Sequence, residues 1–138
     1  MKQIEGEAPV FGKLEIFNMA QNMATHAAGR HTVVSQNIAN ADTPGYRAQD
    51  VASFASTYSS NNSAQPIRAT RAGHLSPQSA AASGARTFES SDPNSPNGNS
   101  VSLELEMVKA SEIRQQHELA LSIYSSSLGI LRASLGRS

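Results

Sequence analysis

Four histidines are the side chains of this sequence best suited to chemistry, because an imidazole can bind a metal ion or exchange a proton near neutral pH. His26 and His31 are five positions apart, which places them about 140° apart around a helix and off a common metal-binding face. His74 and His117 have no cysteine or carboxylate at ligand spacing. We therefore expect no metal site. His31 and His117 fall on predicted helix seams, where we expect each to make an interhelical hydrogen bond.

Serine is abundant, but no nucleophile motif of the form Gly-x-Ser-x-Gly occurs, and no glycine-rich loop is followed by Lys-Ser or Lys-Thr. The 138 residues include no cysteine, which excludes disulfides and thiolate chemistry. The middle of the chain carries three arginines scattered among polar residues, Arg68, Arg71 and Arg86. This arrangement is more typical of a solvated loop than of an anion-binding site. The sequence therefore predicts a protein that is not an enzyme and that uses no cofactor.

The composition limits both the core and the partners. Hydrophobic residues make up 38% of the chain and aromatic residues 5%, so a thick globular core is not expected. Eleven basic and eleven acidic residues give no net field that would attract nucleic acid, so partners should be contacted through apolar surfaces. The start of the chain carries no cleavable signal, and no run of about 18 apolar residues could span a bilayer. Taken alone, these features indicate a cytoplasmic chain.

The elements that must position any functional residue are two long helices. Residues 11–41 carry apolar and small side chains at alternating steps of three and four, which predicts an amphipathic helix. Its seam consists of Phe17, Ala20, Ala24, Ala27, His31, Val34, Ile38 and Ala41. Because alanine dominates this seam, a second helix can approach closely while little apolar area is buried per residue.

Residues 101–138 predict a second helix of similar length, with acidic residues in its first turn and arginines near its end. Its main seam consists of Leu103, Met107, Ala110, Arg114, His117, Leu121, Tyr124, Leu128, Leu131 and Leu135. A second stripe beside it consists of Ile113, Ala120, Ile123 and Ile130. The apolar arc is therefore wider than one partner helix can cover.

The region between the helices, residues 42–100, is rich in Ser, Asn and Pro and cannot fold by itself. Short extended pieces are expected at residues 66–70 and 87–89. Residues 1–10 are expected to form a flexible N-terminal segment. The predicted fold is all-α, with two long antiparallel terminal helices, coiled-coil-like, joined by an irregular middle region with at most short β pieces.

The first helix should end at about Ala41, because Pro44 disfavours helical geometry before it. Thr43-Pro44-Gly45-Tyr46 then predicts a type II turn with positive φ at Gly45. Asn37 and Asn40 can hydrogen-bond the backbone groups that are freed at the helix end.

This stretch, from Asn37 to Tyr46, resembles the signature of the flagellar basal-body rod, hook and hook-associated protein family: Asn, aliphatic, small, Asn, a short polar run, Gly and an aromatic. The positions that carry the signature and its turn are Asn37, Ile38, Asn40, Pro44, Gly45 and Tyr46. Residues 11–30, 69–75 and 97–107 resemble further segments of the proximal rod members, so the resemblance covers nearly the whole chain. Ser102 and Gly73 depart from the pattern, at positions before a Leu-Glu pair and before His74.

The resemblance implies a structural subunit of the basal-body proximal rod, exported without a cleaved signal through the flagellar type III apparatus and assembled in the periplasm. Its terminal helices would polymerise into the hollow rod that transmits torque and conducts exported subunits. The implied partners are other copies, rod proteins including FlgC and the distal subunits, the export-gate adaptor FliE and the MS-ring protein FliF.

The residues that we expect to carry assembly are Phe17, Ala24, Val34, Ile38, Met107, Leu121, Tyr124, Leu128, Leu131 and Leu135. The alternative interpretation is a soluble helical adaptor or secretion chaperone that binds a partner helix in the same seams and never polymerises.

Overall fold

The computed structural model describes residues 8–63, 86–90 and 95–136. Its elements are α1 (Ala8–Ala39), β1 (Gln49–Val51), α2 (Phe54–Ser63), β2 (Thr87–Glu89) and α4 (Leu103–Leu135). The chain divides into two units, one formed by residues 1–31 and 107–138 and the other by residues 32–106. Within the described ranges, no helix is both long and apolar enough to cross a membrane.

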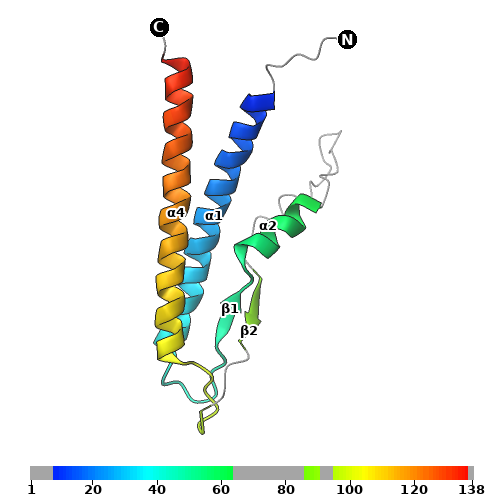
Figure 1. Ribbon diagram of the computed structural model, residues 1–138. Helices are drawn as coiled ribbons and strands as arrows, with labels where there is room; N and C mark the ends of the chain where they lie inside the picture. Colours follow the sequence, from blue (N-terminus) through cyan, green and yellow to red (C-terminus); the bar gives the residue numbers. More distant parts are fainter. Residues whose placement is uncertain (1–7, 64–85, 91–94, 137–138) are drawn as a thin grey trace, which may run out of the picture. The chain divides into compact units, whose positions relative to one another are not determined.

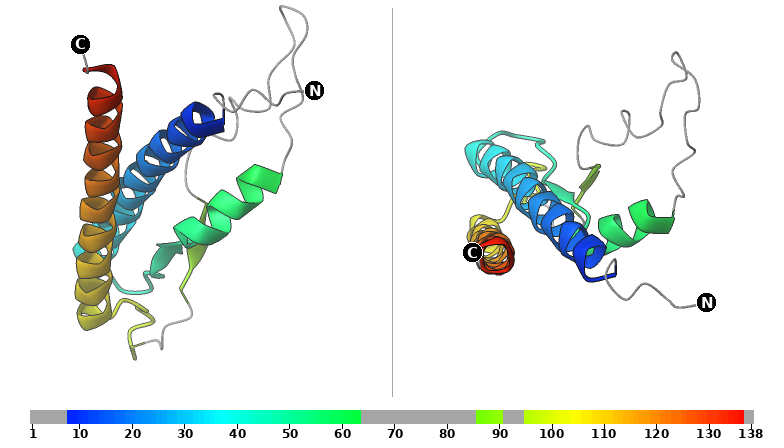
Figure 2. Two further views of the ribbon diagram at one scale, coloured as in Figure 1. Left: turned by 45° about the horizontal axis from the view of Figure 1, so that its top comes forward. Right: turned by 90° about the horizontal axis from the view of Figure 1, so that it is seen from above.

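The first unit is a helical hairpin. Its part of α1 and its part of α4 lie side by side and run in opposite directions (Figures 1 and 2). The contact line is built mainly from alanine: Ala20, Ala27 and Ala120 are each 1% exposed, and Ile113 is 2% exposed. Nearer the start of α1, the Phe17 ring packs edge-on against the Tyr124 ring of α4, and the two ring centroids are 5.3 Å apart. The predicted pair of long antiparallel terminal helices is confirmed.

Helix α1 covers only part of the apolar arc of α4. The buried residues Ile113 and Ala120 belong to the second stripe of the sequence pattern, whereas Met107 and Leu121 of the main seam are 67% and 51% exposed. The reason is geometric, since a single neighbouring helix covers a narrow strip and the apolar arc of α4 is broad. The hairpin therefore keeps large apolar side chains at its surface.

The second unit contains a two-stranded antiparallel sheet in which β1 pairs with β2, with Asp50 opposite Phe88. Strand β2 coincides with the extended piece expected at residues 87–89, whereas the piece expected at residues 66–70 lies outside the described residues.

Helix α2 was not anticipated in the middle region, whose composition is poor in strong helix formers. Ser53 provides its N-cap, because the Ser53 hydroxyl accepts a hydrogen bond from the Ser56 amide at 3.4 Å. Phe54 and Tyr58 are one helical turn apart, and the centroids of their rings are separated by 5.4 Å. This cap and this aromatic pair are the local signals by which the sequence could have indicated the helix.

Candidate functional site

The residues of the signature lie where α1 ends, and the most connected of them is Asn37. Its side chain is 0% exposed. The Nδ2 atom donates to the backbone oxygen of Gln49 at 2.7 Å and to Oε2 of Glu106 at 3.0 Å. The Oδ1 atom accepts from the backbone N–H of Gln49 at 3.0 Å and from the Tyr46 hydroxyl at 3.4 Å. One amide thus joins the end of α1, the start of β1 and the start of α4.

Asparagine suits this position because only a primary amide combines two donors with an acceptor oxygen at this length. Its carbonyl and NH2 groups pair with the N–H and C=O of Gln49 much as a neighbouring strand would. Its second N–H donates to the carboxylate of Glu106, which is also 0% exposed, and this hydrogen bond offsets part of the free-energy cost of burying that group. A side chain that lacked either function would leave a buried polar group without its partner.

A second asparagine, Asn99, serves the same region and was not among the predicted site residues. It is 2% exposed, and its Nδ2 lies 2.9, 2.7 and 2.8 Å from the backbone oxygens of Asn40, Ala41 and Thr43. These oxygens follow the last turn of α1, where carbonyl groups lack helical partners. Asn99 therefore closes the end of a helix that lies about 60 positions earlier in the chain.

The sequence carries a local signal next to Asn99, the Asn-Gly pair at residues 97 and 98, which indicates a turn. The run Asn97-Gly98-Asn99-Ser100 reads as a turn, and Gly98 has a φ of +79°. Within this turn the Asn97 Oδ1 accepts from the Asn99 amide at 3.1 Å, and the Asn99 Oδ1 accepts from the Val101 amide at 2.7 Å. No local sequence pattern identifies the distant backbone oxygens that accept hydrogen bonds from its NH2 group.

The Pro-Gly turn has the geometry that the sequence predicts. Gly45 has a φ of +73°, and the Tyr46 amide donates to the Thr43 oxygen at 3.2 Å, as in a type II turn. A Cβ added to Gly98 would lie 3.5 Å from the Cα of Gly45, so the two turns lie back to back. Both glycines are used for a backbone conformation that other residues rarely adopt.

Backbone hydrogen bonds hold the two loops together. The Gly45 amide donates to the Asn97 oxygen at 3.1 Å, and the Ser100 amide donates to the Tyr46 oxygen at 3.0 Å. The Ala48 amide donates to the hydroxyl of Ser100, which is 1% exposed, at 2.8 Å. We call the four buried members of this cluster, Asn37, Asn99, Ser100 and Glu106, the polar network.

The other two signature residues of α1 and its end lie outside the polar network. Asn40 is half-buried and bonds locally, with its Nδ2 donating to the Gln36 oxygen at 2.8 Å and its Oδ1 accepting from the Thr43 hydroxyl at 3.3 Å. Ile38 is 39% exposed. The structure thus brings Asn37 and Tyr46 into one hydrogen-bonded cluster and assigns Asn40 to the cap of its own helix.

The residues expected to carry assembly differ widely in their exposure to solvent. Val34 is 2% exposed and belongs to the interior, whereas Met107, Leu121 and Tyr124 are 67%, 51% and 42% exposed. Half-buried positions are Phe17, Ala24, Leu128 and Leu131. Leu135 ends α4, and its side chain lies outside the described part of the chain. The exposed group is the part available to another molecule.

A groove of about 680 Å³ lies along the hairpin, lined by residues that include Ala27, His31, Ile113 and His117. Two of the four histidines therefore line one groove. Across the described part of the chain, no three His, Asp or Glu residues are placed to hold one metal ion. His74 and the arginines at positions 68 and 71 lie outside that part.

Comparison with known proteins identifies the family of this chain. A family model described as "Flagella basal body rod protein" matches residues 18–47. The "Flagellar basal body rod protein FlgB" of Agrobacterium fabrum (strain C58 / ATCC 33970) is 31% identical over 117 residues, which cover 82% of this chain and 87% of the relative. The chain belongs to the flagellar basal body rod protein family. It is accordingly a structural component of the basal-body rod, in a family that is structural rather than enzymatic.

The matched segment of this rod protein runs from within α1 to Arg47 and so contains Asn37, the Pro-Gly turn and Tyr46. The partners of these residues, Asn99, Ser100 and Glu106, lie beyond it. The family signature thus supplies Asn37 to the polar network, and the entry to α4 supplies the other three members.

Proposed function

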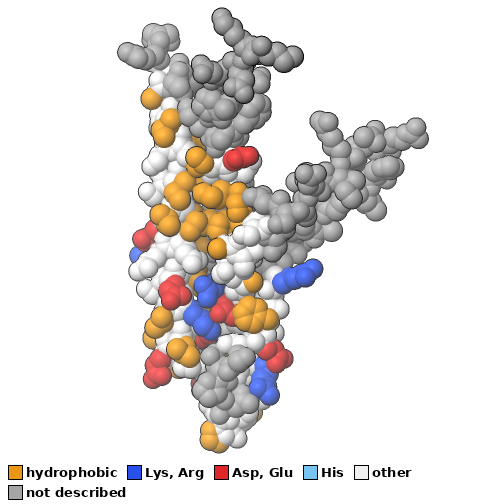
Figure 3. All heavy atoms as spheres, turned by 45° about the vertical axis from the view of Figure 1, so that its right-hand side comes forward, with side chains coloured by type: hydrophobic (Ala, Val, Ile, Leu, Met, Phe, Trp, Pro, Cys, Tyr) orange, Lys and Arg blue, Asp and Glu red, His pale blue; other side chains and the backbone are white. Residues whose placement is uncertain are grey.

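We propose that this chain polymerises through α1 and α4 into the hollow proximal rod of the flagellar basal body, where it transmits torque and conducts exported subunits. The observation that carries the proposal is the exposure of large apolar side chains along α4, including Met107, Leu121 and Ile130 at 67%, 51% and 55%. Exposed apolar surface of this kind marks protein interfaces. Figure 3 shows hydrophobic side chains gathered on one exposed face.

The polar network supports this role by fixing the ends of the two helices. In the second unit it links the last turn of α1 to the first turn of α4 through Asn37 and Glu106. Buried and hydrogen-bonded polar groups have one favourable arrangement, which makes the helix ends rigid. A subunit that transmits torque needs such rigidity, because its helices must carry load from one neighbour to the next.

The remaining parts of the proposal rest on the family resemblance. The chain passes through the flagellar type III export apparatus without a cleaved signal peptide and assembles in the periplasm. Its neighbours are further copies of itself, FlgC and the distal rod subunits, with the adaptor FliE and the MS-ring protein FliF at the base. The similarity to FlgB of Agrobacterium fabrum favours a position in the proximal rod.

The test is the substitution Leu121→Asp, because Leu121 is half exposed and its loss leaves the α1 contact line in place. An unpaired carboxylate in an apolar subunit contact costs about 3–5 kcal/mol, so motility should be lost while export continues. The matched control is Ser122→Asp, at the next exposed position of the same helix. We expect this control to swim.

The two readouts are the amount of chain exported and the amount recovered in purified basal bodies. Normal swimming of the Leu121→Asp strain would contradict the proposed interface. Recovery of the wild-type chain only as a soluble cytoplasmic species would favour the adaptor or chaperone interpretation instead.

A further inference from the structure

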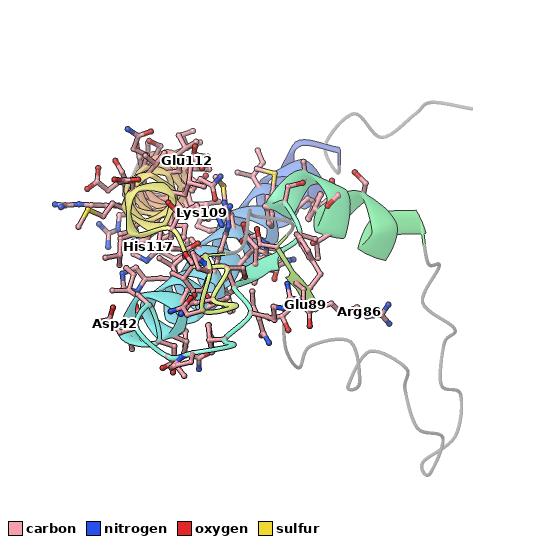
Figure 4. All side chains as sticks on the ribbon, turned by 90° about the horizontal axis from the view of Figure 1, so that it is seen from below. Asp42, Arg86, Glu89, Lys109, Glu112 and His117 are labelled. Carbon is pink, nitrogen blue, oxygen red and sulfur yellow. The ribbon has the colours of Figure 1, made fainter. Side chains whose placement is uncertain are left out.

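In the first unit, α4 exposes apolar side chains on both sides of its contact with α1. The buried residues Ile113 and Ala120 mark the side of α4 that contacts α1. Because successive side chains are rotated by about 100° around a helix, the exposed apolar side chains point to opposite sides of this buried line. The first flank consists of Met107, Arg114, Leu121 and Leu128. The second flank consists of Val108, Glu112, Leu119 and Ile130. Figure 4, which views the helix end on, shows Glu112 and His117 projecting from different sides of α4.

Both flanks are open to solvent over most of their length, and Leu128 of the first flank is half-buried. On the first flank, Met107 and Leu121 are 67% and 51% exposed. On the second, Val108, Leu119 and Ile130 are 57%, 53% and 55% exposed. The helix therefore has two apolar surfaces that its own hairpin partner does not cover.

The two flanks match each other level by level along the helix. Every member of the first flank has a counterpart on the second flank that is only one or two residues away, about 1.5–3 Å along the axis. The levels are Met107 with Val108, Arg114 with Glu112, Leu121 with Leu119, and Leu128 with Ile130. Three levels are apolar on both sides, and the one charged level carries opposite charges. Two parallel copies of α4 side by side would thus pair apolar with apolar and cation with anion.

This pattern distinguishes between the two kinds of contact that identical subunits can make. A two-fold symmetric contact joins one patch to itself, so it would cover one flank and leave the other exposed. A head-to-tail contact joins two different patches, and a series of copies then covers both flanks of every internal member. The presence of two unlike, matched flanks favours the second arrangement.

We propose that the first flank of α4 packs against the second flank of α4 in the next copy of this chain, with Arg114 of one copy binding Glu112 of the next. The proposal rests on the proposed polymerisation and specifies its lateral contact. Arg114 already binds Glu118 within the chain at 3.2 Å, but both side chains are well exposed, 82% and 65%. Such a surface pair is weak, and the five donors of the guanidinium leave room for a second carboxylate.

Disulfide cross-linking tests this contact directly, because the natural chain has no cysteine. The variants are Leu121→Cys, Leu119→Cys and the double variant. Oxidation of basal bodies that contain the double variant should give a ladder of dimers, trimers and larger species on a non-reducing gel. Each single variant should remain monomeric, because its cysteine faces a flank without one.

The outcomes separate this proposal from the one on which it rests. Dimers from Leu121→Cys alone, cross-links to a different protein, or a double variant that enters basal bodies without cross-linking would each overturn the lateral contact. Absence of the wild-type chain from basal bodies would overturn the proposed function itself.

A charge exchange provides a second test that does not depend on cysteine. Arg114→Glu and Glu112→Arg should each reduce the chain recovered in basal bodies by about tenfold, because juxtaposed like charges are strongly disfavoured. The combined variant should restore recovery to near the natural level, and Ser122→Arg, which lies between the flanks, should not reduce it. Failure of the combined variant to recover above either single variant would contradict the Arg114–Glu112 contact.

Discussion

The buried amide of Asn37 donates a hydrogen bond to the buried carboxylate of Glu106 at 3.0 Å, although the two residues lie 69 positions apart. This contact joins the last turns of α1 to the first turn of α4 inside one unit. The same amide pairs with both backbone groups of Gln49. The helix end, the first strand and the start of the last helix are thus held by a single side chain.

The substitution Asn37→Asp should destabilise the fold strongly. It replaces the NH2 donor by an oxygen that faces the Glu106 carboxylate and the Gln49 oxygen, and we expect a loss of about 3 kcal/mol or more in the free energy of unfolding. Asn40→Asp is the matched control and should cost about 1 kcal/mol or less, because Asn40 only caps its own helix. Urea unfolding followed by circular dichroism measures both. Equal losses for the two variants would contradict the central role of Asn37.

The end of α1 should depend on Asn99 and not on the neighbouring Asn97. Asn99→Asp removes the donors that serve three carbonyl oxygens and should cost about 2–3 kcal/mol. Asn97→Asp keeps an oxygen that can accept from the Asn99 amide and should change stability by less than about 0.5 kcal/mol. Hydrogen exchange at the last amides of α1 would show whether this end opens selectively. Unchanged exchange in the Asn99 variant would contradict the assigned cap.

The same change, glycine to alanine, should have opposite effects at two positions. At Gly45, φ is +73°, and alanine there should cost about 1 kcal/mol because its Cβ strains the left-handed conformation. Gly29 lies within α1, and a Cβ added there meets nothing within 4 Å, so alanine should stabilise the helix by about 0.5–1 kcal/mol. Thermal unfolding measures both shifts. A stabilising effect of Gly45→Ala would mean that the type II turn is wrongly assigned.

Close approach of the two helices should depend on the small size of Ala27. The side chain is 1% exposed, and Ala27→Leu should destabilise the hairpin by about 1–3 kcal/mol because a larger side chain at a buried position of the contact line forces its neighbours to shift. Ala28→Leu, at the adjacent exposed position, provides the control and should have an effect below about 0.5 kcal/mol. If both variants unfolded at the same urea concentration, the alanine contact line would not limit the helix distance.

The features that were predicted correctly are those that depend on neighbours in sequence. The alternating steps of three and four indicated both long helices, since periodicity is a property of a single segment. Pro44 and Gly45 indicated the turn because each restricts its own backbone. Local composition also explains the miss at α2, where a serine cap and an aromatic pair outweighed a weak helix propensity.

The burial of Glu106 could not be predicted from its neighbours in sequence. Its place in the first turn of α4 indicated only a carboxylate whose charge the helix dipole stabilises, and the same holds for Glu104. In the structure Glu104 is exposed, whereas Glu106 is fully buried against Asn37. Two residues of one type and one local setting thus have different roles, because a distant residue packs against Glu106 whereas Glu104 faces solvent.

The sequence by itself determined the two terminal helices, the turn between α1 and β1, and the family to which the chain belongs. The tertiary structure decided that Ile113 and Ala120 face α1, that Met107 and Leu121 stay exposed, and that Asn99 serves the end of α1. The physical reason is that a helical pattern fixes which residues share a face, while the choice of the face that is buried depends on a partner far away in the chain.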